Sequence, residues 1–312
     1  MDTYYDSLDL NDDNVDKFET FSYSKYESDI YSQTKDLQLD DVTVNNFYKI
    51  DDITQQLYLK FLVHNRKYSS LYKFLEIYPN IFFENNILFY SILYNSTLTD
   101  HQNIIYDLIK LFIEKGFDVT SNNNLAIKLA SKSPFKILNL IIENGADVTV
   151  DNNFPIRNCL NHDCYKKFLL LIKNGADPYV NNYYVLKKSI GSLDIIQYYI
   201  ELGVDINIDD GICLRRSIFD GHFKTIKFLL KNGADVTLLN NYDILLVIQS
   251  RNINILNILV DSGLDLSRIN SFCESKINKS DALQKWRNTF LFLINEGVDP
   301  FNIIYIMDLE NV

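Results

Sequence analysis

Cysteine, proline and tryptophan are scarce in this chain, and their scarcity excludes several classes of protein. The 312 residues include 4 Cys, 5 Pro and 1 Trp. Four cysteines are too few for a disulfide framework in a chain of this length, so reduced thiols are expected. An average composition otherwise, with 47% hydrophobic and 23% charged residues, is typical of a soluble folded protein.

The sequence also lacks long apolar stretches and a signal peptide. No stretch approaches the roughly 18 apolar residues that a membrane-spanning helix needs. The first residues, MDTYYDSLDLNDD, are acidic and have neither the basic start nor the apolar run of a secretory signal. We therefore expect a cytoplasmic protein that has no membrane partner.

Charge is unevenly distributed along the chain. Residues 1–46 contain 12 Asp and Glu against 3 Lys, a net charge of −9, which leaves −2 of the total of −11 for the rest. A phosphate-binding surface needs clustered Lys and Arg, so no nucleic-acid partner is expected. We expect residues 1–46 to form an acidic, disordered tail. The alternative is a short binding motif marked by its aromatic residues, which are Tyr4, Tyr5, Phe18, Phe21, Tyr23, Tyr26 and Tyr31.

One motif recurs seven times, in forms such as ENGADVT and KNGADPY. Its glycines are spaced 29, 30, 28, 30, 30 and 34 residues apart, at Gly116, Gly145, Gly175, Gly203, Gly233, Gly263 and Gly297. A fixed period in this range indicates a repeat protein, in which each unit buries its apolar face against its neighbours.

Each glycine ends a predicted helix, and a second predicted helix follows at a constant offset. Before Gly145, the apolar residues Ile137, Leu138, Ile141 and Ile142 have the spacing of an amphipathic helix, which the glycine closes in the left-handed conformation. Fourteen residues after successive glycines come small residues, flanked by large apolar ones: Ala130, Cys159, Ser189, Ser217 and Val247. The unit is therefore an antiparallel helix pair with a loop.

Pairs of Asn or Asp recur six to eight residues after the glycines. They are Asn123-Asn124, Asn152-Asn153, Asn181-Asn182, Asp209-Asp210 and Asn240-Asn241. We interpret these pairs as N-caps of the following helices, because such side chains accept hydrogen bonds from the first helical amides. The alternative interpretation is that they contact a ligand.

The segment DGICLRRSIFDGHFKTIKFLLKNGADV, residues 210–236, resembles an ankyrin repeat. It has the family's landmarks at Asp210, Gly211, Leu214, Gly221, His222, Ile226, Leu229, Leu230, Gly233, Ala234 and Asp235. The ankyrin period is about 33 residues, so these units are some three residues short, and the finger before the first helix should be more loop than hairpin. Short units rich in Asn, Ile and Tyr are similar to those of the ankyrin proteins of giant DNA viruses of amoebae.

This resemblance implies an all-α fold, an ankyrin-like helical solenoid of about seven to eight helix pairs with short inter-repeat loops. Residues 47–83 contain two helical patterns, from Ile50 to His64 and from Tyr68 to Tyr78, and are expected to form a degenerate capping pair at the N-terminal end. The repeat array is expected to cover 84–299, and residues 300–312 to form a C-terminal half-repeat cap.

Catalytic and metal-binding patterns are weak. Cys159, His162 and Cys164 could suggest zinc, but Cys159 occupies the small helix-packing position and no fourth ligand is near. There is no phosphate-binding loop, nucleophile elbow or paired-carboxylate motif. We therefore expect no metal, no cofactor and no enzymatic activity.

The family binds through its fingers and first helices, and this implicates seven residues as partner-binding by their offset. They are Phe154, Tyr183, Tyr184, Lys187, Arg215, Arg216 and Tyr242. The alternative for each aromatic residue is packing in the core or against a neighbouring loop. Lys187, Lys188, Arg215 and Arg216 are predicted to face outward as a basic strip, which is either a solvated face or a site for an acidic partner or for the tail.

The function that these features favour is a non-enzymatic scaffold for protein–protein interaction. Its partner would be another protein, and for a viral effector it would be a host protein in the host cytoplasm. The alternative is a structural or self-associating component of a particle.

Overall fold

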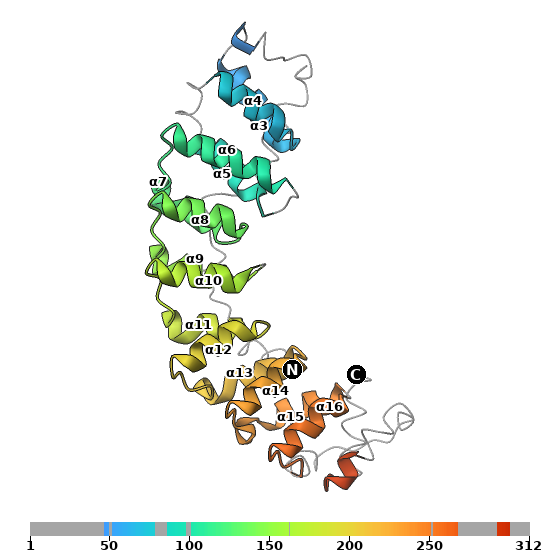
Figure 1. The fold of residues 1–312 in the computed structure, drawn as a ribbon. Coiled ribbons are helices and arrows are strands. Elements are labelled where there is room, and N and C mark those ends of the chain that lie inside the picture. Colours follow the sequence, from blue (N-terminus) through green and yellow to red (C-terminus); the bar gives the residue numbers. More distant parts are fainter. Residues whose placement is uncertain are drawn as a thin grey trace, which may run out of the picture. The chain divides into compact units, whose positions relative to one another are not determined.

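The computed structural model describes residues 47–49, 52–78, 86–97, 101–161, 163–250, 252–267 and 292–299. These residues contain helices and no strand, and seven helix pairs follow one another along the chain (Figure 1). The predicted tail 1–46 and half-repeat 300–312 lie outside the described residues. The pairs are α3(Asp52–His64) with α4(Tyr68–Ile77), α5(Asn86–Asn95) with α6(Gln102–Glu114), α7(Ser121–Ala130) with α8(Phe135–Glu143), α9(Val150–Asn158) with α10(Cys164–Lys173), α11(Val180–Lys188) with α12(Leu193–Glu201), α13(Ile208–Phe219) with α14(Phe223–Lys231), and α15(Asn241–Gln249) with α16(Ile253–Asp261).

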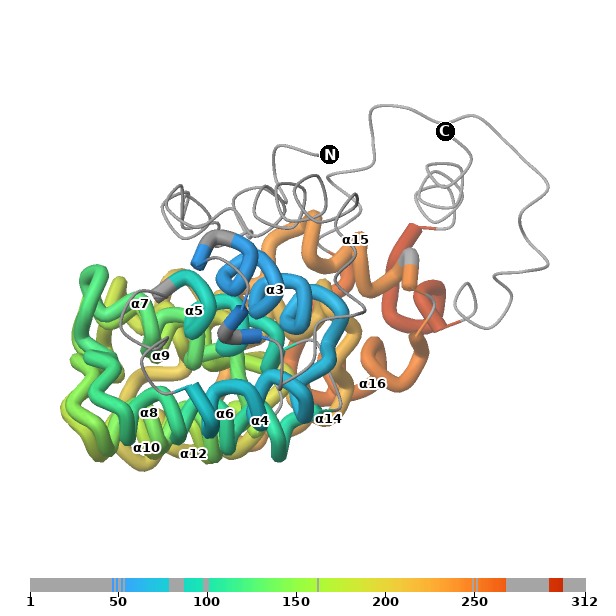
Figure 2. Tube along the Cα trace, turned by 90° about the horizontal axis from the view of Figure 1, so that it is seen from above, coloured from blue at the N-terminus to red at the C-terminus, as the bar shows by residue number. Residues whose placement is uncertain are grey.

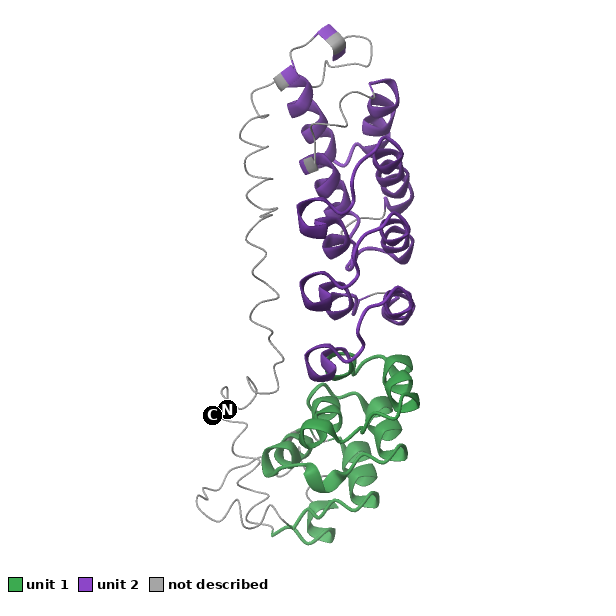
Figure 3. Ribbon diagram, turned by 90° about the vertical axis from the view of Figure 1, so that its left-hand side faces the viewer, with its two compact units in different colours: residues 1–10, 186–312 green, residues 11–185 purple. Residues whose placement is uncertain are grey.

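The chain divides into two compact units, and the division falls within α11, after Val185 (Figure 3). In the unit that contains α3 to α10, the first helices of the pairs (α3, α5, α7 and α9) pack side by side in one layer. The second helices (α4, α6, α8 and α10) form the other layer (Figure 2). The other unit has the same plan, because α13 packs beside α15 and α14 beside α16. The predicted ankyrin-like all-α architecture is therefore confirmed.

The recurrent glycines end the second helices as predicted. At the end of α6, the amide of Phe117 donates to the carbonyl of Phe112 at 3.0 Å, and the amide of Gly116 donates to that of Ile113 at 2.9 Å. These two bonds are a Schellman motif, which requires a left-handed residue at the position of the glycine. Gly116 has a φ of +96°, and the six other glycines of the motif also have positive φ. Glycine is the residue that adopts this conformation at little cost.

The core consists of the positions that the periodicity predicted. In α8, Ile137, Leu138, Ile141 and Ile142 are all buried, and the small residues of the first helices, such as Ala130, are buried as well. Burying each Leu or Ile contributes about 1.5 to 3 kcal/mol. The helices predicted around 50–64 and 68–78 are α3 and α4, and their role as a cap stays a prediction.

The capping interpretation of the Asn and Asp pairs is confirmed at one site and wrong at four. Asn240 does cap α15, because its side chain accepts from the amides of Tyr242 and Asp243. The other four pairs lie in three-residue turns in which every residue is left-handed, with φ between +47° and +73°. These turns are 122–124, 151–153, 181–183 and 209–211. Asn and Asp tolerate this region better than other non-glycine residues do.

The left-handed turns predict an unusual order of stabilities at Asn152, whose φ is +53°. Glycine adopts this conformation freely and alanine does not, so Asn152→Gly should be more stable than Asn152→Ala by about 1 kcal/mol. In a right-handed helix, alanine is favoured over glycine by about the same amount. Urea unfolding of both variants measures the difference. Asn139 within α8 is the control, where Ala should be favoured, and an order of Ala over Gly at Asn152 would contradict the left-handed turn.

Candidate functional site

The loops that follow the glycines are held by aspartates. In six of the loops the Asp carboxylate accepts a hydrogen bond from the backbone amide two residues later; in the first of them, the amide of Thr120 donates to Asp118 over 2.8 Å. A second bond from the Thr120 hydroxyl helps to hold the pKa of Asp118 below its usual value. The same loop recurs at Asp147, Asp177, Asp205, Asp235 and Asp265. The loops therefore expose an Asp at a regular interval along the chain.

The left-handed turns fix these loops to the neighbouring pair. The Asn124 side chain accepts from the amide of Asp147 at 2.9 Å, and Asn153 accepts from the amide of Asp177 at 2.8 Å. The turns also join each other, because the side-chain Nδ2 of Asn152 donates to the side-chain Oδ1 of Asn181 at 2.7 Å. The Asn and Asp residues thus order the exposed loop edge within this unit.

Buried cations of the first helices make a second connection between successive pairs. Lys128 pairs with Asp151, and Lys187 pairs with Asp209 at 2.5 Å. In both cases the lysine lies twelve residues after the glycine, and the aspartate opens the left-handed turn of the next pair. The hydrogen bond from Lys128 is the main reason why the pKa of Asp151 lies below its usual value. Arg215, at the same position, pairs with Asp243 at 2.9 Å.

These ion pairs correct the predicted basic strip. The Lys187 side chain is only 7% exposed and that of Arg215 13%, so neither faces outward as expected. Both side chains are largely buried, and their charged ends reach an aspartate of the next pair. One repeat alone gave no sign of the partner, which lies 22 residues further along the chain in the case of Lys187. A comparison of repeats does indicate the partner, because a lysine and an aspartate recur at nearly the same spacing in Lys128 and Asp151.

Phe154 is also buried, contrary to its predicted place on a binding surface. The guanidinium carbon of Arg157 lies 6.0 Å from the centre of its ring. The same guanidinium group donates to the carbonyls of Asp151 and Asn152 at 3.0 and 3.1 Å. Phe154 therefore packs beneath the arginine that holds the left-handed turn, which is the alternative foreseen for the aromatic residues.

The remaining predicted residues keep accessible surface. Tyr242 lies in the first turn of α15 and is 42% exposed, and Tyr183 and Tyr184 of α11 are half-buried. Tyr179, which the offset argument missed, is 46% exposed and meets the ring of Tyr183 edge-on at 5.6 Å between centroids. Arg216 is half-buried and donates to Asp220 at 3.1 Å. The structure leaves the partner-binding role of these residues a proposal.

Lys167 is a buried lysine that the sequence reading overlooked. Its ammonium group donates to the carbonyls of Ser131 and Ser133, at 3.1 and 3.3 Å, and to the side chain of Asn161. The side chain is fully buried, and this burial lowers the pKa of Lys167. In the other unit Thr225 occupies the same place in its helix and donates to the carbonyl of Ile190 at 2.8 Å. A polar residue in this apolar position therefore binds the turn of the preceding pair.

The cysteine predicted to pack between helices does so. Cys159 is fully buried, its thiol donates to the carbonyl of Ile156, and burial raises its pKa to about 12. A thiol in this state is a poor metal ligand and a poor nucleophile. His162, the middle residue of the zinc alternative, lies outside the described residues. Within the described ranges, no three His, Cys, Asp or Glu side chains cluster so that they could hold a metal ion.

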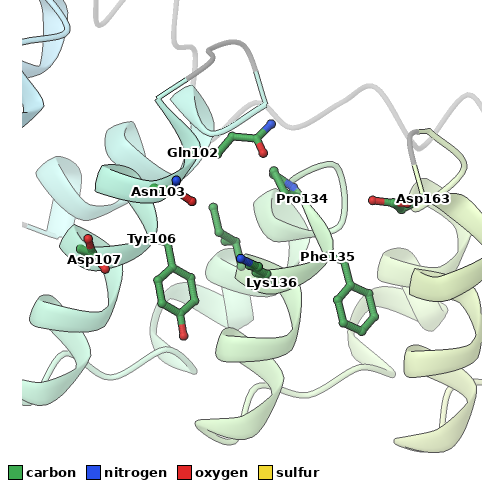
Figure 4. A pocket seen from close by; sticks show the side chains of 9 residues that line it. Gln102, Asn103, Tyr106, Asp107, Pro134, Phe135, Lys136 and Asp163 are labelled. Atoms are coloured by element: carbon green, nitrogen blue, oxygen red, sulfur yellow. The ribbon is translucent and has the colours of Figure 1, made fainter.

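A groove lies on the second-helix layer, between the first turns of α6 and α8. Asn103, Tyr106 and Lys136 line it, and Asp163 closes it at the start of α10 (Figure 4). The lining mixes both signs of charge, and it includes none of the residues that the sequence singled out.

No helix in the described part of the chain is long and apolar enough to span a membrane.

The stacked helix pairs, the glycine-ended second helices and the short loops define the class of the protein: an ankyrin-like repeat protein. No family model matches the chain. It is similar to three proteins of Acanthamoeba polyphaga mimivirus that are named as ankyrin repeat proteins. One is 35% identical over 198 residues, 62% of each chain; a second is 32% identical over 117 residues, 35% of this chain and 36% of the relative; a third is 36% identical over 121 residues, 38% and 40%.

These relatives confirm the predicted resemblance to the ankyrin-repeat family and to the ankyrin proteins of giant viruses. The chain spans less than two thirds of the length of the relatives that it matches.

Proposed function

We propose that this protein is a non-enzymatic scaffold that binds another protein through its first helices and the loops before them. Similarity to ankyrin repeat proteins supports a scaffold for protein interaction. The observation that carries the proposal is the position of two exposed aromatic side chains, Tyr179 and Tyr242. Both lie where a loop meets a first helix, each in its own unit. Tyrosine is among the residues that most often dominate the energy of protein interfaces.

The ordered loop edge supports the same proposal. A repeat surface costs less entropy to bind when its loops are already fixed, and here hydrogen bonds join successive turns and loops. Buried cations such as Lys187 pair with aspartates of the turns. The exposed polar and aromatic groups of the loops are then available to contact a partner. By analogy with the viral relatives, we infer that the partner is a host protein and that the scaffold acts as a viral effector in the host cytoplasm.

The proposal predicts that tyrosine truncation weakens capture of a partner without unfolding the scaffold. We expect the immobilised full chain to enrich the same proteins repeatedly from an amoeba lysate. Tyr179→Ala and Tyr242→Ala should each reduce the recovery of those proteins about tenfold, since truncating a central interface tyrosine costs about 1.4 kcal/mol or more. Quantitative mass spectrometry measures the recovery, and circular dichroism verifies the fold.

The matched control removes an exposed apolar side chain from the other layer. Leu169 of α10 has a similar exposure to solvent, and Leu169→Ala should leave recovery unchanged. Failure of the folded chain to enrich any protein reproducibly would contradict the proposal. Equal losses for all three variants would place the contact elsewhere than on the first-helix face.

A further inference from the structure

Helix α14 exposes three lysines on one face. Lys224, Lys227 and Lys231 are all exposed, and they recur at the i, i+3 and i+7 spacing of a single helix face. The opposite face, with Ile226 and Leu229, is buried. We call these three lysines the lysine row. None of the three forms an ion pair with another described residue, as Lys128 and Lys187 of the first helices do.

Packing does not require the lysine row. Two other second helices have only acidic or neutral residues at the same three positions relative to the closing glycine, which are Asp194, Gln197 and Glu201 in α12, and Asn254, Asn257 and Asp261 in α16. Helices α6, α8 and α10 have one or two lysines at these positions, and none of them has all three. Like charges three and four residues apart destabilise a helix. Lys224, in the first turn, also faces the positive end of the helix dipole, and that turn has no acidic residue. Lys231 stands in the last turn, where the dipole favours a cation, but the fold does not explain Lys224 and Lys227.

Two exposed phenylalanines lie at the N-terminal end of the row. Phe219 ends α13 and is 44% exposed, and Phe223 begins α14 and is 37% exposed. Phe219 occupies a turn position at which other pairs have Lys132, Asn161 or Gly191. The guanidinium group of Arg216 lies 6.0 Å from the centre of the Phe219 ring. The surface thus combines an aromatic end with a line of positive charge.

We propose that the lysine row with Phe219 and Phe223 is a docking surface for an acidic segment of a partner protein. The segment carries an apolar residue that contacts the two phenylalanines and carboxylates that follow the lysines along α14. The positive charge of the row selects an acidic ligand. Because the row is only one helix wide, it accommodates a single extended segment better than a broad surface. Asp261 of α16 stands at the position equivalent to Lys231 on a helix that packs beside α14, about 10 Å away.

The acidic flank favours a peptide over broader anions. A membrane surface or a nucleic-acid duplex extends well beyond one helix and would bring its own negative charge against Asp261 of the flanking helix α16. A single peptide segment fits a strip one helix wide. The row lies on a second helix, whereas the proposed scaffold function uses the first helices, so the two proposals can fail independently.

The test measures binding of a synthetic peptide to the full chain. The probe is a fluorescent twelve-residue peptide of Asp and Glu with one Phe near an end. Fluorescence anisotropy measures its binding. Replacing all three lysines by glutamine should lower the affinity for the peptide about tenfold. Raising salt from about 50 to 300 mM should lower the affinity of the unmodified protein by a similar factor. Phe223→Ser should lower the affinity for this peptide. The same variant should bind a second peptide, which has Ser in place of Phe, as tightly as the unmodified protein does.

The matched control substitutes exposed lysines of other second helices. A variant with Lys110→Gln, Lys136→Gln and Lys166→Gln has the same change of net charge and should bind the peptide as the unmodified protein does. Equal weakening in both triple variants would overturn the proposal, because net charge alone would explain it. Tighter binding of a twelve-nucleotide single-stranded RNA, or of vesicles containing phosphatidylserine, would overturn it in favour of those ligands.

The chain's own acidic segment is the remaining competitor. A full-length variant in which the 12 Asp and Glu of residues 1–46 become Asn and Gln separates the two cases. We expect the same peptide affinity as for the unmodified chain. A tenfold gain in affinity would overturn the proposal and assign the row to residues 1–46.

Discussion

Replacing Lys167 by alanine should lower the free energy of unfolding by about 3 to 5 kcal/mol. The substitution removes three hydrogen bonds that a fully buried ammonium group donates, and it leaves the carbonyls of Ser131 and Ser133 without this donor. Each unsatisfied buried acceptor costs about 1 to 3 kcal/mol, and loss of the four-carbon stem opens a cavity. Release of the penalty for burying the charge offsets part of this cost, since burial already lowers the pKa of Lys167.

The neighbouring residue provides a matched control. Lys166 is 72% exposed on the side chain and pairs with Asp163 at 3.7 Å, so Lys166→Ala should change the stability by less than about 0.5 kcal/mol. Lys167→Met keeps the stem but loses the donors, and it should fall between the two. Urea unfolding measures all three variants, and hydrogen exchange of α9 and α10 shows whether the loss is local, because repeat proteins can unfold in parts. A change below about 1 kcal/mol for Lys167→Ala would contradict the buried contacts.

Lys167 also shows where the sequence alone was sufficient and where it was not. The helix pairs could be predicted because each depends on local features that recur, namely an apolar stripe and a glycine that closes the helix in a Schellman motif. Lys167 stands in such a stripe, where other second helices have residues like Ile137. A lysine there reads as a break in the pattern, and only the carbonyls of the preceding turn explain it.

The left-handed turns and the ion pairs were missed for different reasons. Asn and Asp are favoured both as N-caps and in the left-handed region, so the pairs at Asn152 and at Asn240 look alike in sequence but differ in structure. A single repeat does not show whether Lys187 is buried or exposed, because the aspartate with which it pairs belongs to the next repeat. The exposed Tyr179 was missed because it precedes its helix, outside the offsets used to place the other residues.

The buried ion pair of Arg215 with Asp243 should be the second large contributor to stability. Asp243 is almost fully buried and accepts from the Arg215 guanidinium and from the backbone amide of Asn240, both at 2.9 Å. Asp243→Ala therefore removes the partner of a largely buried cation and half of the capping box of α15. Breaking a buried pair in this way costs about 3 to 5 kcal/mol, of which the cap accounts for about 1.

The adjacent pair of the same residue types tests whether burial is the cause. Arg216 pairs with Asp220 at 3.1 Å, but both side chains are more exposed and lie four residues apart at the C-terminal end of α13. A double-mutant cycle to alanine, followed by urea unfolding, should give a coupling energy of about 1 to 3 kcal/mol for Arg215 with Asp243 and about 0.5 kcal/mol or less for Arg216 with Asp220. Equal coupling energies would contradict the buried pair and would return Arg215 to the solvated basic strip that the sequence predicted.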